Sequence, residues 1–456
     1  MVRPLRVINI VGLTPALLGE HTPQLLRLVD EGFLAQLEGV FPALTCTAQA
    51  SMLTGTYPER HGIVANGWYS REHAEVLFWK QANQLVAGEK VWERARAIVP
   101  GFSCAQLFWW FNMYASVDYS VTLRPIYPAD GRKIPALYSN PPDLYKSYQS
   151  RLGAFPMFNF WGPQADIRSS QWIADCARLE FDDHRPGLQL VYLPHLDYNL
   201  QRLGPDDPAI WQDVAQIDRV AGELIDQATQ GGADVLVVSE YGIEPASGVV
   251  NINQHLRRHG LLQVRETLGW ELLDAGASRA FAVADHQVAH VYLREQHDIS
   301  RVADLLGALP GVAQVLNTRD QSKWRIAHQR SGDLVVVAEP GYWFTYYYWL
   351  EEERAPDFAR TVDIHRKPGY DPVELFIDPD IRLPKVRLAL KLLRKQLGFR
   401  TLMDVIPLKP QLVKGTHGRP AASPQLGPLL IGSRRDLARD RYLMVEVKDL
   451  ILRHFV

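Results

Sequence analysis

Three short apolar runs, each followed at once by polar residues, constrain the fold of this chain more than any other feature. They are Leu5–Val11, Leu188–Leu193 and Ala233–Ser239. Continuous Val, Ile and Leu with little alternation is typical of parallel strands buried on both faces. Helical patterns lie between them, one beginning at Pro23 and one covering about 209–229. Strands that alternate with helices predict an α/β fold with a mainly parallel sheet.

Polar residues follow two of these strands at the point where each strand ends. His195 and Asp197 come after the second run, and Glu240 and Tyr241 come after the third. In open α/β sheets, ligands bind beyond the carboxyl ends of the strands. On an extended chain, His195 and Asp197 would point to the same side because they are two residues apart. We therefore expect a functional site at this edge of the sheet.

Charge and cysteine content exclude several classes of protein. Lys and Arg number 49 against 51 Asp and Glu, a formal net charge of −2 that argues against binding a nucleic acid polymer. The three cysteines have no paired spacing, which disfavours a disulfide framework or zinc ribbon and favours a reducing compartment. No run reaches the 18 or so apolar residues of a transmembrane segment, and the first apolar run is short for a signal peptide. These features predict a cytoplasmic protein without a transmembrane segment.

The segment from Phe41 to Asn66 is the most informative in the chain. Thr45 follows a loop and precedes a run, residues 48–53, that can be helical. A hydroxyl at a helix N-terminus faces unpaired backbone N–H groups and the positive end of the helix dipole, which together favour an anion. The same threonine could equally be a simple N-cap. Its neighbours decide between the two interpretations.

Phe41-Pro-Ala-Leu-Thr45, followed by Ser51-Met-Leu-Thr-Gly-Thr-Tyr-Pro-Glu-Arg-His-Gly-Ile-Val-Ala-Asn66, resembles the type I phosphodiesterase and nucleotide pyrophosphatase group of the alkaline phosphatase superfamily. The resemblance implies that Thr45 is the nucleophile and that Asn66 donates to a phosphoryl oxygen. It also implies two divalent metal ions about 4 Å apart, which clamp the phosphoryl group and activate the threonine hydroxyl. Zn, Mn and Mg are the candidate metals, as one ion or two.

The same resemblance assigns the metal ligands, which the family draws from Asp and His residues in four motifs. The matching positions in this chain are Asn9, Asp197, Gln201, Glu240, Tyr241 and His417. Gln201 and Tyr241 stand where the family has His, and Asn9 is the best match by spacing for a missing Asp.

These departures leave three interpretations open. The protein uses one metal or altered metals, it recruits ligands from elsewhere in the chain, or it has lost the chemistry and kept a binding site. A site of Asn9, Thr45, Glu240 and Tyr241 offers only oxygen ligands, which suit Mg²⁺, Mn²⁺ or Ca²⁺ better than zinc. The polar segment Asp285–His290 is one possible source of further ligands.

Four other polar residues are candidates for substrate binding. His195 is either a displaced metal ligand or a residue that orients its neighbours. His365, Arg366 and Lys367 lie in a polar segment, 361–371, where Asp363 and His365 would share one side of a strand. The two cations could hold a phosphate or carboxylate. The alternative is a hydrogen-bonded structural cluster.

A basic amphipathic segment, 385–399, lies late in the chain. A helix with Lys and Arg on one side could contact a membrane surface or an acidic partner. An ordinary helix with a solvated face has the same pattern.

We expect an alkaline phosphatase-like α/β fold, with a mixed, mainly parallel sheet sandwiched by helices. Residues 1–290 and 405–456 would form a discontinuous catalytic core, and 291–404 an inserted cap or accessory region. The predicted function is metal-dependent hydrolysis of a small-molecule phosphoester, like that of a phosphodiesterase or nucleotide pyrophosphatase. The alternatives are a phosphoryl transferase or phosphomutase in small-molecule biosynthesis, and a catalytically degenerate binding or scaffold protein.

Overall fold

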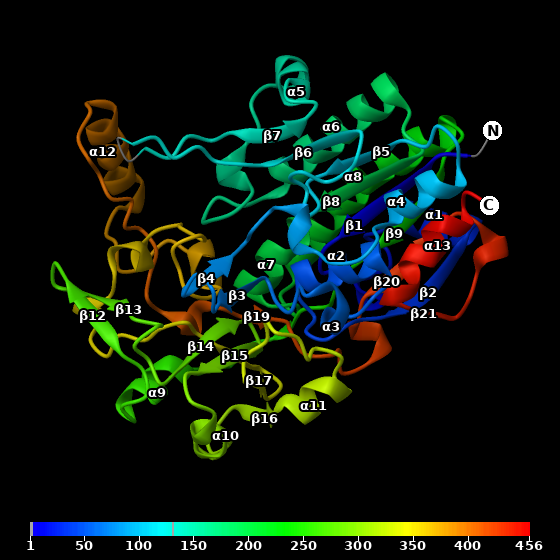
Figure 1. Ribbon diagram of the computed structural model, residues 1–456. Helices are drawn as coiled ribbons and strands as arrows, with labels where there is room; N and C mark the ends of the chain where they lie inside the picture. Colours follow the sequence, from blue (N-terminus) through cyan, green and yellow to red (C-terminus); the bar gives the residue numbers. More distant parts are fainter. Residues whose placement is uncertain (1–2, 130–131) are drawn as a thin grey trace.

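A nine-stranded sheet forms the centre of the protein in a computed structural model that describes residues 3–129 and 132–456 (Figure 1). Its strand order is β21-β2-β20-β9-β1-β8-β5-β6-β7. The bounds are β1 Leu5–Ile10, β2 Phe33–Glu38, β5 Cys104–Leu107, β6 Tyr119–Leu123, β7 Leu137–Asn140, β8 Leu188–Leu193, β9 Asp234–Val238, β20 Leu429–Gly432 and β21 Arg441–Leu443. The five strands from β9 to β6 are parallel, whereas β7 and β20 run antiparallel to their neighbours. The mixed, mainly parallel sheet predicted from the sequence is confirmed.

Helices cover both faces of this sheet (Figure 1). One face carries α1 Pro23–Glu31, α6 Ile167–His184, α7 His195–Leu203 and α8 Ile210–Gln230. The other carries α2 Thr45–Thr54, α4 Val91–Ile98 and α13 Val447–Arg453. The two helices expected from the sequence correspond to α1 and α8.

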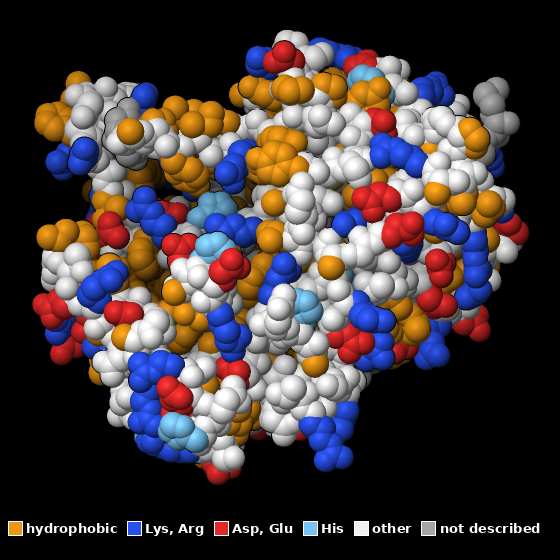
Figure 2. Space-filling model, in the orientation of Figure 1, with side chains coloured by type: hydrophobic (Ala, Val, Ile, Leu, Met, Phe, Trp, Pro, Cys, Tyr) orange, Lys and Arg blue, Asp and Glu red, His pale blue; other side chains and the backbone are white. Residues whose placement is uncertain are grey.

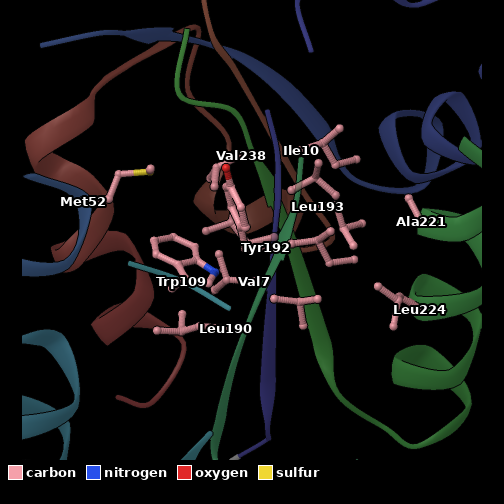
Figure 3. Packing of buried hydrophobic residues seen from close by; sticks show 14 of the residues in the cluster. Val7, Ile10, Met52, Trp109, Leu190, Tyr192, Leu193, Ala221, Leu224 and Val238 are labelled. Atoms are coloured by element: carbon pink, nitrogen blue, oxygen red, sulfur yellow. The ribbon is translucent and has the colours of Figure 1, made fainter. Parts of the chain in front are cut away.

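The three predicted strands are β1, β8 and β9, and they lie side by side at the centre of the sheet. Figure 3 shows how both faces of these strands are buried: Met52 of α2 approaches from one side, and Ala221 and Leu224 of α8 from the other. Every residue of the three strands is buried. Burial on both faces explains why their sequences are continuously apolar.

A second sheet, of four strands, lies beside the first (Figure 1). Its order is β14-β15-β17-β16, with β14 Ala280–Asp285, β15 Val288–Leu293, β16 Val312–Leu316 and β17 Leu334–Ala338. The predicted boundary between residues 290 and 291 falls inside β15. The division into a core and a cap stays a prediction, but the small sheet begins with β14, before that boundary.

The remaining elements are short. They are α3 Pro58–His61, α5 Leu144–Leu152, α9 Ile252–Arg258, α10 Ile299–Gly307, α11 Thr318–Lys323, α12 Pro384–Gln396, β3 Gly67–Ser70, β4 Glu75–Phe78, β10 Glu244–Pro245, β11 Gly248–Val250, β12 Val264–Thr267, β13 Trp270–Leu273, β18 Tyr342–Phe344 and β19 Gly415–Thr416. The basic amphipathic segment forms α12. Among the described residues, no helix is both long and apolar enough to cross a membrane.

Candidate functional site

The carboxyl ends of β1, β8 and β9 bring the predicted site residues together. Asn9 lies near the end of β1, Asp197 is in the first turn of α7 after β8, and Glu240 and Tyr241 follow β9. Thr45 begins α2, and its side chain reaches the same place. All of these residues are buried. The predicted position of the site at this edge of the sheet therefore agrees with the structure.

Thr45 is linked to a carboxylate through a phenol. The Thr45 Oγ1 lies 2.9 Å from the hydroxyl of Tyr241, and that hydroxyl donates to Oδ1 of Asp197 across 3.4 Å. Burial raises the pKa of Asp197 to about 7 and raises the pKa of Tyr241 well above its usual range. The tyrosine therefore stays a neutral phenol between a hydroxyl and a carboxyl group.

Glu240 receives two amide donors. Asn9 Nδ2 and Gln49 Nε2 each donate to Oε1 of Glu240 across 2.6 Å, and Gln49 accepts the backbone N–H of Trp110. Burial raises the pKa of Glu240 to about 8, although hydrogen bonds from Gln49, Asn9 and Thr45 counteract part of the shift. At neutral pH the carboxyl group is therefore mostly protonated.

Asp197 has a second donor from the adjacent turn of α7. Gln201 Nε2 donates to Oδ2 of Asp197 across 2.7 Å, and Gln201 Oε1 accepts from the hydroxyl of Tyr370. The glutamine that stands in place of a family histidine thus holds the carboxylate through its amide nitrogen and uses its oxygen elsewhere.

Asn66 is hydrogen-bonded to a carboxylate of the chain itself, that of Asp285. Its side-chain oxygen accepts the backbone N–H of Cys46 across 3.0 Å. Its backbone N–H and its Nδ2 donate to the two oxygens of Asp285, across 2.9 and 3.2 Å. The Asn66 amide, which the family resemblance predicts to donate to a phosphoryl oxygen, therefore donates to Asp285 instead.

Four aromatic rings form a continuous stack beside these groups. Tyr241 lies on His417, His417 on His286, and His286 on Tyr370, with ring centroids 3.7 Å apart at each step. We call this set the ring stack. The Nδ1 of His417 donates to the carbonyl of Ala43, and burial lowers the pKa of both histidines well below the usual range. Both imidazoles are therefore neutral.

The side chains do not fit the metal centre that the resemblance implies. Two predicted ligands, Asn9 and Gln201, direct their amide N–H groups at the carboxylates where a cation would sit, and Tyr241 directs its hydroxyl. Among the predicted ligands, the side-chain oxygens left without a hydrogen bond are Asn9 Oδ1 and Glu240 Oε2, on residues 0% and 1% exposed. Across residues 3–129 and 132–456, no three His, Cys, Asp or Glu side chains gather as a metal site.

The remaining predicted site residues lie in other surroundings. His195 is not on an extended chain, as expected, but begins helix α7, where its Nε2 lies 3.3 Å from Asp213 instead of pointing with Asp197. The segment 361–371 is not a strand but a series of turns.

The two expected cations of that segment already have partners. Lys367 is buried and forms 2.7 Å ion pairs with Asp371 and Glu374. Arg366 is largely exposed and pairs with Asp363. Burial lowers the pKa of His365 to about 4. The predicted contact of Lys367 with a phosphate is therefore wrong, because its ammonium group already forms ion pairs with two carboxylates.

Sequence reasoning missed two members of the site. Gln49 lies four residues after Thr45 and so faces the same side of α2, a spacing that could have identified it. Tyr370 is recognisable only in the fold, since its contacts with Gln201 and His286 span 169 residues and 84 residues of chain. The segment Asp285–His290, considered as a source of further ligands, does reach the site, through Asp285 and His286.

Comparison with known proteins identifies a family. The model of the type I phosphodiesterase / nucleotide pyrophosphatase family matches residues 5–371. An uncharacterized pyrophosphatase/phosphodiesterase of Schizosaccharomyces pombe is 26% identical over 50% of this chain and 41% of that protein. Human ectonucleotide pyrophosphatase/phosphodiesterase family member 1 is 22% identical over 47% of this chain and 20% of that protein. The matches thus span less than half the length of either relative.

Two solved structures share the whole fold. Murine ectonucleotide pyrophosphatase/phosphodiesterase 5 in complex with AMP aligns with a TM-score of 0.60 and 15% identity, covering 100% of this chain and 95% of that one. Phosphonoacetate hydrolase from Sinorhizobium meliloti in complex with phosphonoformate aligns with a TM-score of 0.62 and 14% identity, covering 100% and 96%. The predicted alkaline phosphatase-like fold is confirmed.

Proposed function

Because this chain belongs to the type I phosphodiesterase / nucleotide pyrophosphatase family, we propose that it hydrolyses a small phosphoester with Thr45 as the nucleophile, without the family's metal centre. The observation that carries the proposal is the hydrogen-bonded path from Thr45 through Tyr241 to Asp197. This path gives the threonine proton a destination inside the chain.

Each proton released in the attack on phosphorus has an acceptor among these groups. The Thr45 oxygen forms a bond to phosphorus while its proton passes to the Tyr241 oxygen, and the Tyr241 proton passes to Asp197. Burial raises the pKa of Asp197 to about 7, which suits a general base at neutral pH. The phenol, whose own pKa is far higher, relays the proton and does not remain as phenolate.

The bond from phosphorus to the leaving oxygen breaks in the same step. Glu240, mostly protonated at neutral pH, gives that oxygen its proton. Water then attacks phosphothreonine, Glu240 recovers a proton from that water, and the proton on Asp197 returns through Tyr241 to Thr45. The two carboxyl groups end as they began.

The charge of the site bears on the class of substrate. Among the described residues, no Lys or Arg forms an ion pair with Asp197, Glu240 or Asp285. An anion gains less there than in a site lined by cations. We therefore expect a singly charged diester to be preferred over a doubly charged monoester.

Binding without turnover is the second candidate. The hydrogen bonds from Asn66 to Asp285 favour it, because an Asn66 amide that already donates to a carboxylate contributes less to stabilising the charge that develops on a phosphoryl oxygen during transfer.

The deciding experiment measures phosphodiester, pyrophosphate and phosphomonoester hydrolysis in the presence of a chelator. Thr45→Ala should lower kcat by roughly a thousandfold or more, whereas Thr45→Ser keeps the hydroxyl and should retain activity within about tenfold. Tyr241→Phe keeps the ring on His417 but removes the relay, and should cost about 100-fold or more.

Two results would contradict the proposal. Full activity in Thr45→Ala would exclude this residue as the nucleophile. Saturable binding of a phosphoester to the unaltered protein, with no product released, would establish the second candidate.

A further inference from the structure

Helix α12 and its flanks, residues 382–402, differ from the rest of the molecule, and we call this segment the basic arm. In α12 itself no residue is buried. Apolar side chains lie in the solvent along its length, with Val386 53%, Leu390 56%, Leu393 51% and Leu397 66% exposed. Figures 1 and 2 show the segment as a projection from the body of the protein, with hydrophobic and basic side chains on its surface.

Four of the exposed apolar side chains form one ridge of the helix, and Leu392, 47% exposed, lies outside it. Val386, Leu390, Leu393 and Leu397 are spaced three or four residues apart, so they lie along the same side. The chain attaches to the other side of the helix, because Lys391 and Arg387 pair with Asp404. These two basic side chains therefore hold the helix to the segment that carries Asp404, and the other five Lys and Arg residues of the basic arm do not take part in that contact.

The charge of the basic arm is entirely positive. It contains seven Lys and Arg residues and no Asp or Glu, in a protein whose formal net charge is −2. An open hollow of about 420 Å³ lies against the helix, lined by Leu383, Val386 and Leu390 together with four basic side chains. Apolar groups bordered by cations are the chemistry that suits the headgroup region of an anionic bilayer.

A second exposed apolar group lies on the loop between β6 and β7. Ile126 is 54% exposed and Tyr127 50% exposed. In Figure 1 this loop extends on the same side of the molecule as α12.

We propose that the basic arm binds the surface of an anionic membrane. The ridge of Val386, Leu390, Leu393 and Leu397 enters the boundary between headgroups and acyl chains, and the flanking Lys and Arg contact anionic headgroups. The full chain would thus associate peripherally with a bilayer, whichever substrate its buried site accepts.

The test is co-sedimentation of the full chain with vesicles. Vesicles of phosphatidylglycerol mixed with phosphatidylcholine should bind the protein, and vesicles of phosphatidylcholine alone should bind it at least about tenfold more weakly. Raising the ionic strength should weaken binding to the mixed vesicles, because the contribution of the cations is screened.

Two variants separate the apolar from the basic contribution. The double substitution Leu390→Gln with Leu393→Gln removes the apolar ridge without changing the net charge, and should lower partition onto mixed vesicles at least about tenfold. Lys385→Gln with Arg394→Gln keeps the ridge and should lower it by roughly tenfold or more. Leu268→Gln is the matched control, since Leu268 is 84% exposed on a different hairpin, between β12 and β13, and its loss should leave binding unchanged.

Three outcomes would overturn the proposal. The first is equal binding to neutral and anionic vesicles, and the second is an unchanged partition of the Leu390 and Leu393 variant. The third is a dimer in solution that this variant dissociates, with no vesicle binding by the unaltered chain, which would assign the ridge to a second copy. Thermal unfolding of each variant checks that the fold is intact.

Discussion

The buried site and the basic arm differ in whether their charged and apolar side chains are enclosed by the chain or exposed to solvent. At the site, each carboxyl group has a donor from the chain itself, and every group is enclosed. In the basic arm, a ridge of leucines and most of the cations face solvent. The contrast teaches that the polar groups of the first region find their partners within the chain, whereas the apolar side chains of the second have no such cover.

The largest expected difference between the two regions is in the stability lost when an ion pair is removed. Lys367→Met should lower the free energy of unfolding by about 3–5 kcal/mol, because it leaves Asp371 and Glu374 buried without a counter-charge. Arg387→Met, which removes an exposed pair with Asp404 in the basic arm, should cost less than about 1 kcal/mol. Urea denaturation measures the free energy of unfolding of both variants. Equal losses would show that the buried and the exposed ion pair contribute the same stability, against the contrast drawn above.

The pH dependence of stability provides a smaller test. Burial raises the pKa of Asp197 and Asp285 to about 7 and that of Glu240 to about 8. The folded chain therefore holds protons that the unfolded chain releases near pH 4, so the free energy of unfolding falls as pH rises toward 8. Histidines kept neutral by burial, such as His417, act oppositely, but only below about pH 6.5.

Thermal unfolding should accordingly show a falling midpoint between about pH 6.5 and 8. Glu240→Gln should make this decline shallower by about 1 kcal/mol, since the amide carries no proton to lose. Glu72→Gln alters an exposed residue and is the control. A decline of the same slope in the Glu240 variant would mean that this carboxyl group is already ionised in the folded chain.

The smallest expected effect is that of metal removal. Dialysis against a chelator should shift the thermal midpoint by less than about 1 °C, because amide and phenol groups already donate hydrogen bonds to the carboxyl groups that a metal would need as ligands. Elemental mass spectrometry of protein purified without a metal-affinity resin measures the content directly. About one equivalent of a divalent metal per chain, lost together with stability, would contradict the assignment of a metal-free site.

The fold was predictable because its central strands carry a strong local signal. The runs at β1, β8 and β9 are apolar throughout, since both faces of each strand are covered. Thr45 and Asn66 were found through a long motif close to one helix. The surroundings of His195 were not predictable, because the change from strand to helix occurs at that residue and reverses the direction of its side chain.

The hydrogen-bond partners of the site residues could not be predicted from the sequence for a related reason. Asn9 and Gln201 could be recognised as substitutions, but the donation of their amide N–H groups to Glu240 and Asp197 depends on contacts across the sheet edge. Tyr370 reaches the site from a series of turns that has no periodic pattern to reveal it. The local motif located the site, whereas long-range packing determined its chemistry.

The ring stack has a consequence for how the site responds to a single substitution. Its four rings come from separate segments, around residues 241, 286, 370 and 417, and each ring rests on the next. Placing histidine at position 241 alone would offer one metal ligand, yet Asn9 and Gln201 would still direct their amide N–H groups at the carboxyl groups. The stack therefore couples four distant segments, so that a smaller side chain at any one position would leave a cavity against the ring beside it.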